Sequence, residues 1–329
     1  MSQSYRAVSY SILGVLLVFA WIHLHGGEFE FHFSDLWKSL FHFSEQDQNL
    51  IIFREIRIPR TFIAIVAGAG LSIAGLLMQT LFSNPLAGPS VLGITSGSSL
   101  LVAISMLTGI SFFASDFGIV AVALIGAVIF SLIILLFSMF VKSHVSLLLI
   151  GIMLGGFTNA VIQVLQVSTK ASQLKVFTLW GFGSMQQVNF SQIPLILAIF
   201  GLGLITLIFL IKPLNLLVIG EKSTRLLGIQ LQQFRILIIV VTAIFAGLIT
   251  AYCGPISFIG LAVPNIVKIL YKTQNHLHLI IGSALIGAIS LLFCDLLVLW
   301  LEPWILLPLN GVTALFGSPI VVWIILKRF

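Results

Sequence analysis

The sequence carries little charge. Asp, Glu, Lys and Arg make up only 8% of its 329 residues, whereas 59% are hydrophobic and the mean hydropathy is +1.17. Soluble globular domains carry about 25% charged residues. The composition therefore excludes a soluble globular protein. It predicts an all-α polytopic membrane protein, with a single transmembrane domain over residues 1–329.

Cysteine is also scarce. Cys253 and Cys294 are the only two, and both lie in or beside apolar stretches. We interpret them as small hydrophobic side chains in packed helices. The sequence gives no support for a disulfide framework.

Motifs that would carry chemistry are missing as well. The chain has no Gly-x-x-x-x-Gly-Lys-Ser/Thr loop, so any ATP hydrolysis must come from another polypeptide. It has no His-Glu-x-x-His motif, no Ser/His/Asp set and no paired carboxylates, which leaves an intramembrane enzyme with little support. No soluble basic face is available for nucleic acid.

Four histidines fall at or beyond the end of the first apolar run: His23, His25, His32 and His42. His23 and His25 are two residues apart, so a helix would point them to different faces. We expect solvated or interfacial histidines here, with a metal or haem site as the alternative.

The chain does contain about ten apolar runs of the length that a bilayer crossing needs. We predict helices at 7–25, 58–82, 91–108, 118–141, 145–167, 191–211, 235–253, 258–271, 277–301 and 308–327, with a short extra helix near 174–184. The first run lacks a small-x-small cleavage site, so we interpret it as a retained helix rather than a signal peptide. Ten crossings put both termini on one side.

Basic residues orient these helices. If both termini are cytoplasmic, ten Lys and Arg residues fall on the cytoplasmic side and six outside, the asymmetry that the positive-inside rule requires. Three of the outer six, Arg54, Arg57 and Arg60, crowd at the start of the second helix. We interpret this cluster as a receptor for carboxylates of an extracellular partner, because arginine forms bidentate pairs with them. Pairing with Glu55 or with lipid phosphate is the alternative.

The longest polar stretch between apolar runs is residues 212–235, on the cytoplasmic side in this topology. Its scattered apolar residues, punctuated by Gly220 and Gly228, predict two short amphipathic helices. Such a unit suits docking onto another protein. An interfacial helix on the lipid headgroups is the alternative.

Small residues and one acid stand out within the apolar runs. Small residues recur near helical spacing at Gly68, Gly70, Gly75, Gly151, Gly155, Gly156, Gly282 and Gly287, which predicts close helix packing. Asp295 is the clearest intramembrane acid. We favour a hydrogen-bonded packing role for it, with a gate or pathway role and proton coupling as alternatives.

Several blocks of the sequence match a known family, in order from about residue 50 to the C-terminus. They are Arg57-Ile-Pro-Arg60, Gly68-Ala69, Ala74-Gly75, Gln79, Asn84-Pro-Leu-Ala87 with Pro89, Leu92-Gly93, residues 214–221 with 227–229, residues 254–264, Asp295, Leu307-Pro308-Leu-Asn and Gly317-Ser-Pro319. This pattern resembles the FecCD-type permeases, the membrane subunits of type II ABC importers for iron–siderophores, haem and cobalamin. The chain departs from the family pattern at Asn265 and Lys268, where His and Arg are usual. It also has Leu299 where some members carry a third outer arginine, and it lacks the Glu that often precedes the late Leu-Pro, with Glu302 nearby instead.

The resemblance implies a permease bundle that works as a dimer, identical or paralogous, around one pathway. Two ATPase subunits would bind on the cytoplasmic side and a substrate-binding protein on the other. The implied sites are Arg57 and Arg60 for docking of the binding protein; Leu216, Gly220, Glu221, Arg225, Leu227 and Gly228 for ATPase coupling; Gln79, Asn84, Pro85 and Pro89 for a hinge near the pathway; and Ser143, His144 and Val145 for a gate.

The function that the resemblance implies is import of an iron–siderophore complex, or else of haem or cobalamin, across the cytoplasmic membrane of a prokaryote. ATP and Mg²⁺ would be bound by the partner ATPase, and no cofactor is expected on this chain. The alternative is an ion-coupled secondary transporter, for which inverted repeats with charged helix centres are expected.

Overall fold

The computed structural model describes residues 2–26, 37–39, 47–108, 116–141, 143–218, 220 and 230–328, and the secondary structure within them is helical. The long helices are α1 (Ser2–His25), α4 (Ile58–Leu81), α6 (Asp116–Phe140), α7 (His144–Val167), α9 (Ile193–Leu217), α11 (Leu231–Cys253) and α13 (His276–Leu301). The other elements are α3 (Gln48–Ile52), η1 (Phe53–Arg57), η2 (Pro89–Leu92), α5 (Ile94–Leu107), α8 (Ala171–Gly181), η4 (Phe190–Gln192), α12 (Ile259–Tyr271) and α14 (Leu309–Arg328).

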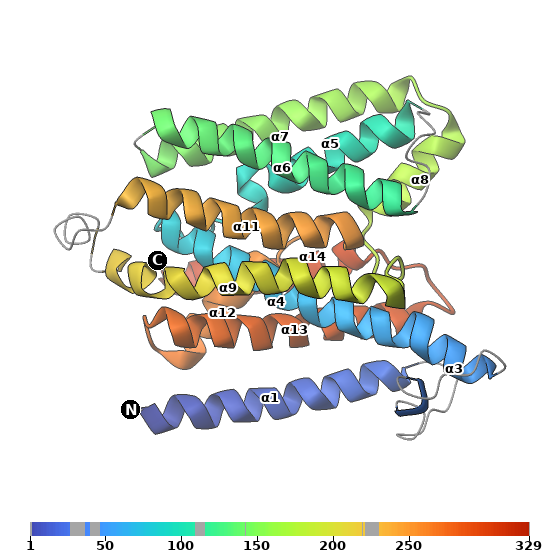
Figure 1. The fold of residues 1–329 in the computed structure, drawn as a ribbon, viewed down its shortest axis with the longest axis horizontal. Helices are drawn as coiled ribbons and strands as arrows, with labels where there is room; N and C mark the ends of the chain where they lie inside the picture. The colour runs from blue at the N-terminus through green and yellow to red at the C-terminus, as the bar shows by residue number, and fades with distance from the viewer. Residues whose placement is uncertain are drawn as a thin grey trace.

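Seven helical segments of the described chain are long and apolar enough to cross a membrane, by length and composition. Each of them corresponds to one of the seven long helices. Three shorter apolar helices are α5, α12 and Leu309–Ile324 of α14. Each of the ten predicted ranges therefore has a helix, and α8 is the short extra one. The helices lie side by side, and the two ends of the chain are at the same end of the bundle (Figure 1).

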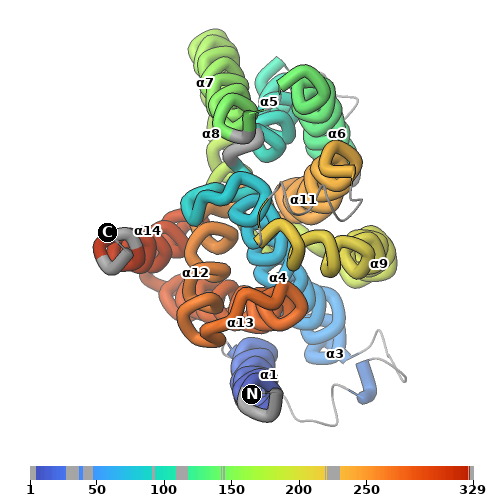
Figure 2. Tube along the Cα trace, turned by 90° about the vertical axis from the view of Figure 1, so that its left-hand side faces the viewer, coloured from blue at the N-terminus to red at the C-terminus, as the bar shows by residue number. Residues whose placement is uncertain are grey.

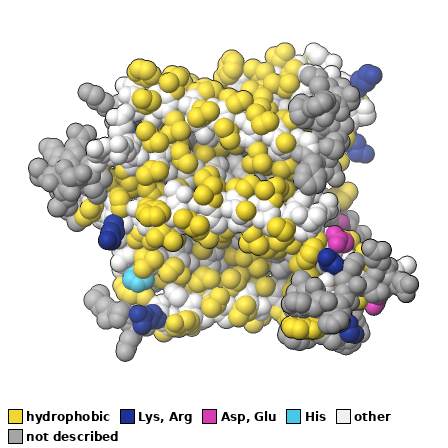
Figure 3. Space-filling view, viewed as in Figure 1, with side chains coloured by type: hydrophobic (Ala, Val, Ile, Leu, Met, Phe, Trp, Pro, Cys, Tyr) yellow, Lys and Arg dark blue, Asp and Glu magenta, His cyan; other side chains and the backbone are white. Residues whose placement is uncertain are grey.

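The surface of the bundle suits a bilayer. Hydrophobic side chains cover the middle of the face shown in Figure 3, whereas the charged side chains of the described residues lie near its two ends. A belt of this kind faces lipid at low cost because no charge has to be buried in hydrocarbon.

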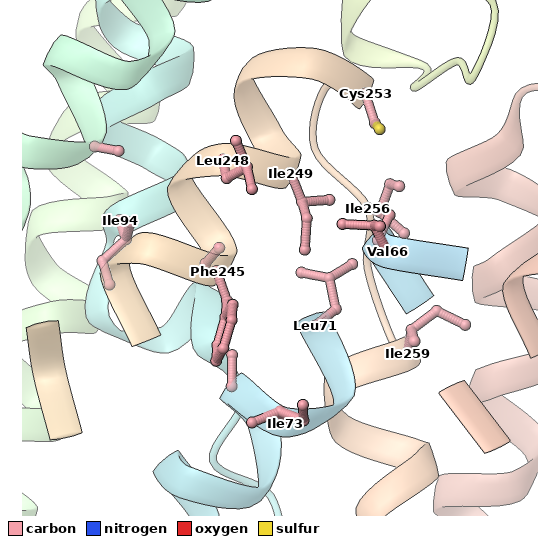
Figure 4. Packing of buried hydrophobic residues seen from close by; sticks show 14 of the residues in the cluster. Val66, Leu71, Ile73, Ile94, Phe245, Leu248, Ile249, Cys253, Ile256 and Ile259 are labelled. Carbon is pink, nitrogen blue, oxygen red and sulfur yellow. The ribbon is translucent and has the colours of Figure 1, made fainter. Parts of the chain in front are cut away.

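Helix α4 lies at the centre of the bundle (Figure 2). It is buried over most of its length, and its glycines explain how. A Cβ on Gly68 would overlap the backbone of Gly287 on α13, and a Cβ on Gly75 would overlap that of Gly260 on α12. Small residues thus let three helix backbones approach closely, as predicted. On its other side, Leu71 and Ile73 of α4 face Phe245 and Ile249 of α11 in the core (Figure 4).

Two differences from the predicted elements are informative. Gly156 was expected to pack against another helix, but a Cβ there would meet nothing within 4 Å. Helix α9 runs on through Pro213 to Leu217, past the predicted end at 211. The start of the 212–235 stretch is therefore a continuation of a membrane helix. Residues 219 and 221–229 lie outside the described residues, so the two predicted amphipathic helices cannot be placed there.

Candidate functional site

The basic cluster at the start of α4 lies on a π-helical turn. Element η1 joins α3 to α4 and carries Arg54 and Arg57 in one continuous helical segment. Such turns are rare, and they are often found at functional sites. Arg54 lies 3.7 Å from Glu55 and 4.6 Å from the ring centre of Phe190, so its guanidinium contacts groups of the same chain.

Arg57 is the second basic residue of η1. It is half-buried, and its Nε atom is buried with no hydrogen-bond partner among the described residues. A buried donor without a partner costs about 1–3 kcal/mol. The rest of the Arg57 side chain is partly exposed, and its docking role stays a prediction.

Arg60, one turn further on, is paired inside the protein. Its Nε donates to Oδ2 of Asp295 at 2.7 Å, and its Nη2 donates to Oδ1 at 3.0 Å. His23 donates from Nε2 to the same Oδ2 at 2.8 Å, and its Nδ1 lies 2.8 Å from Oγ1 of Thr61. These four residues, the buried polar cluster, are each at most 5% exposed.

The buried polar cluster changes two expectations. His23 was expected to be solvated or interfacial, but it is buried and ties α1 to α13 and α4, because the turn of α1 directs it inward. Arg60 was expected to stand beside Arg57 for a partner, but its guanidinium is occupied by Asp295. We therefore keep the docking prediction for Arg57. Asp295 has the hydrogen-bonded packing role that we favoured.

The chain breaks after α4 at residues 84–89, and this break is a tight turn with hydrogen bonds inside it. The Asn84 side chain accepts from the amide of Leu86 at 2.9 Å, the Asn84 amide donates to the Gln79 carbonyl at 3.1 Å, and the Ala87 amide donates to the Asn84 carbonyl at 3.1 Å. Pro89 is buried. Irregular backbone at membrane depth needs such partners within the protein.

Helix α12 holds this break from the other side. Asn265 Nδ2 donates to the carbonyls of Pro85 and Leu261, both at 2.9 Å. Lys268 Nζ donates to Gln79 Oε1 at 2.8 Å, and Gln79 Nε2 donates to the Leu261 carbonyl at 3.1 Å. Asn265 and Lys268 are the two departures from the family pattern. In this chain they fasten α12 to the break, a role that sequence reasoning missed.

Two other blocks of the sequence pattern meet at the opposite end of α12. The Asn310 amide donates to the Phe182 carbonyl at 2.9 Å, and Asn310 Oδ1 accepts from the amide of Ser257 at 3.0 Å. The Ser184 amide donates to the Cys253 carbonyl at 2.9 Å. The ends of α8 and α11 and the start of α14 are thereby joined, which allows α12 and α14 to begin inside the bundle.

The predicted gate residues lie at the start of α7. Ser143 is its N-cap, and its side chain accepts from the amide of Ser146 at 3.4 Å. His144 is the first residue of α7, and Val145 is 67% exposed. Their position at a helix end is as expected, and the gating role stays a prediction.

The predicted coupling residues are only partly within the described structure. Leu216 is in the last turn of α9, and the amide of Gly220 donates to the Leu217 carbonyl at 3.0 Å. Glu221, Arg225, Leu227 and Gly228 lie outside the described residues. The coupling role therefore also stays a prediction.

Helix α7 has an exposed face unlike those of α6 and α9. The exposed described residues of α6, and those along residues 194–209 of α9, are all apolar, as lipid contact requires. By contrast, α7 exposes Asn159 and Gln163, one turn apart, beside the unfilled space at Gly156. Amides facing hydrocarbon are costly. Helix α7 lies at the edge of the bundle (Figure 2), and this face of it suits water or a protein neighbour better than lipid.

Comparisons with known proteins agree with this geometry. The haemin transport permease HmuU of Yersinia pestis is 33% identical over 328 residues, which cover 96% of each chain. The vitamin B12 import permease BtuC of Salmonella paratyphi A is 36% identical over 274 residues, 83% of each chain. A metal-chelate type ABC transporter, solved in an inward-facing conformation, superposes with a TM-score of 0.86 at 27% identity, covering 98% of this chain and 99% of that one.

A more distant structure, PsaBC from Streptococcus pneumoniae, shares the fold with a TM-score of 0.58 at 16% identity. The model of the FecCD transport family matches residues 15–327, nearly the whole chain. The chain therefore belongs to the FecCD transport family, and it is a membrane-spanning permease of an ABC transporter.

Proposed function

We propose that this chain is the permease subunit of an importer that takes up an iron–siderophore complex, with haem and cobalamin as the next candidates. The observation that supports uptake of a metal chelate is the match of 96% of the chain to a haemin permease, together with the match to a vitamin B12 permease. Both cargoes are large metal chelates, the chemical class to which iron–siderophores belong.

Energy for import comes from ATP bound with Mg²⁺ by a separate ATPase. The sequence supports this assignment because it has no phosphate-binding loop. The ATPase docks at the 212–235 stretch, through Leu216, Gly220, Glu221, Arg225, Leu227 and Gly228. With more basic residues on that side, it faces the cytoplasm together with both termini, and the protein lies in the cytoplasmic membrane of a prokaryote.

A second permease, identical or paralogous, covers the exposed face of α7. Gly156, Asn159 and Gln163 support this, because a water-lined pathway and a packed neighbour are the two settings that satisfy exposed amides at membrane depth. The break at 84–89 is the hinge beside that pathway, and Ser143, His144 and Val145 form its cytoplasmic gate.

A direct test is uptake by proteoliposomes that contain the permease, its co-purified ATPase and its binding protein. The probes are radiolabelled iron–ferrichrome, haemin and cyanocobalamin. We expect ATP-dependent, vanadate-sensitive uptake, with iron–ferrichrome transported best. Uptake that persists under vanadate and collapses with a protonophore would instead indicate an ion-coupled secondary transporter.

Docking of the binding protein is assigned to Arg57. Replacing Arg57 with alanine removes the partner of a carboxylate that is buried on docking, so affinity for the binding protein should fall by about 2 kcal/mol or more. The measurement is binding of the purified binding protein to the transporter in nanodiscs. Lys175→Ala, an exposed lysine on α8, is the matched control. Equal affinities for the two variants would contradict the docking role.

A further inference from the structure

The N-terminus of α13 is capped by a residue from another helix. Asn275 caps α13 in the usual way, by accepting from the amide of Leu277 at 2.9 Å. The preceding amide, that of His276, donates instead to Oδ1 of Asn215 on α9 at 2.7 Å. One free amide at a helix start is thus satisfied by a different helix.

The His276 ring continues this contact into α4. It is 2% exposed, and its Nδ1 lies 3.1 Å from the same Asn215 oxygen while its Nε2 lies 3.0 Å from Oγ1 of Thr80. Because Asn215 Oδ1 already accepts from a backbone amide, it is the oxygen of the side chain, and Nδ1 must carry the proton that it accepts. In the neutral ring Nε2 is then an acceptor, so the single hydrogen of the Thr80 hydroxyl is shared between Nε2 and the Leu76 carbonyl, which lies 2.9 Å from Oγ1.

The contacts run from Asn215 through His276 to Thr80, and both end residues lie beside segments with proposed roles. Asn215 is in the last turn of α9, where the 212–235 stretch leaves the membrane helix. Thr80 is next to Gln79, which bonds α12 and accepts from the amide of Asn84 at the break. A displacement of the stretch therefore acts within one helical turn on Asn215, and a displacement of Thr80 acts directly on the break.

We propose that Asn215, His276 and Thr80 form a mechanical link that transmits movement of the ATPase-coupling stretch to the break after α4. The three are positioning residues. Hydrogen bonds suit this task because their directionality makes α9 and the end of α4 move together, whereas apolar contacts allow sliding. The proposal rests on the proposed function, since ATP hydrolysis supplies the movement.

The test uses the complete transporter in nanodiscs with nitroxide labels on cysteines introduced at Leu86, in the break, and at Trp304, beyond α13. Both sites are exposed, whereas Cys253 and Cys294 are buried. The label-to-label distance is measured by electron paramagnetic resonance with and without ATP, Mg²⁺ and vanadate. Steady-state ATP hydrolysis is measured on the same preparations.

Asn215→Ala and Thr80→Val should keep ATP hydrolysis within about twofold and reduce the population with a shifted distance about tenfold. Asn215→Asp and Thr80→Ser, which keep the acceptor and the hydroxyl, should restore the shift. The double variant should be no worse than either single one, because both break the same link.

Two control variants separate a link from a structural role. Asn275→Ala removes a cap from the same end of α13 and changes neither Asn215 nor His276. Thr206→Val removes a hydroxyl that, like that of Thr80, bonds the carbonyl four residues earlier, but on α9 and without a second helix. Both should keep the ATP-driven shift.

The link is overturned if Asn215→Ala keeps the shift, or if Asn275→Ala loses it equally. If the Asn215→Ala transporter does not assemble, the link is tested by comparing the ATP-driven shift of Thr80→Val with that of Thr206→Val. A wild-type transporter that binds no ATPase or shows no ATP-dependent shift would overturn the proposed function itself, an outcome that differs from loss in the variants only.

Discussion

At the residue scale, the buried polar cluster is the most unusual feature of the bundle. Asp295 accepts three hydrogen bonds, two from Arg60 and one from His23, all within the apolar interior. The desolvation of such a pair offsets most of its Coulomb energy, so the pair adds little net stability. Removing one partner, however, leaves a buried charge without compensation. The cluster therefore specifies how α1, α4 and α13 fit together.

The corresponding prediction concerns Asp295→Asn. This variant leaves the Arg60 guanidinium buried without a counter-charge, so we expect a loss of about 3–5 kcal/mol in the free energy of unfolding. The measurement is thermal or denaturant unfolding of the purified permease in detergent. Glu302→Gln, at an exposed position seven residues further on, should change stability by less than about 1 kcal/mol. A similar small change for Asp295→Asn would contradict the role of the cluster.

At the scale of elements, α4 organises the bundle because many of its side chains are small. Its glycines bring the backbones of α13 and α12 against it, and its larger side chains are reserved for the core with α11. Close approach increases van der Waals contact, which replaces the hydrophobic effect as the force between helices in lipid. The break follows directly at its end, so the closely packed helix α4 is joined to the proposed hinge.

Gly68→Ala tests this packing. A single methyl group there would overlap the backbone of Gly287, so α4 and α13 must separate, at a cost of about 1–3 kcal/mol. Gly201→Ala on α9 is the control, because a Cβ there meets nothing within 4 Å. The control should be neutral or stabilising by about 0.5–1 kcal/mol, since alanine favours helix. If unfolding experiments give both variants the same stability, close approach is not what holds the two helices.

At the scale of the whole molecule, one side of the chain differs from the rest. The face shown in Figure 3 is apolar over its middle and suited to lipid, whereas α7 exposes the amides of Asn159 and Gln163. A second permease that covers this side would complete the surface and enclose a pathway between the two chains.

Gly156→Leu tests that arrangement. The new side chain has open space in the single chain but would clash with a neighbour packed on α7, so we expect unchanged unfolding and a dimer weakened about tenfold. The mass of the detergent-solubilised permease, measured by light scattering, reports the dimer. Gly201→Leu places the same side chain in open space on the lipid-facing helix α9 and should leave the dimer intact. An undisturbed dimer in Gly156→Leu would place the partner elsewhere.

Most of the helices could be predicted from the sequence, because a bilayer crossing requires a long apolar run and polar breaks mark its ends. The prediction failed where a helix crosses such a break: α9 continues through Pro213. Of the candidate site, the positions of Arg57 and of the turn at Asn84 could be predicted. The partner of Arg60 could not, because it lies 235 positions away along the chain.

The sequence by itself determined that this protein is an all-helical membrane permease, since composition, periodicity and the ordered family motifs are properties of the chain alone. Only the tertiary structure decided which polar groups meet. It buried His23 and Arg60 on Asp295, fastened Asn265 and Lys268 to the break, and joined Asn215 to Thr80 through His276. In an apolar bundle every buried polar group needs a partner, and the partner is set by which helices pack together rather than by which residues are neighbours in sequence.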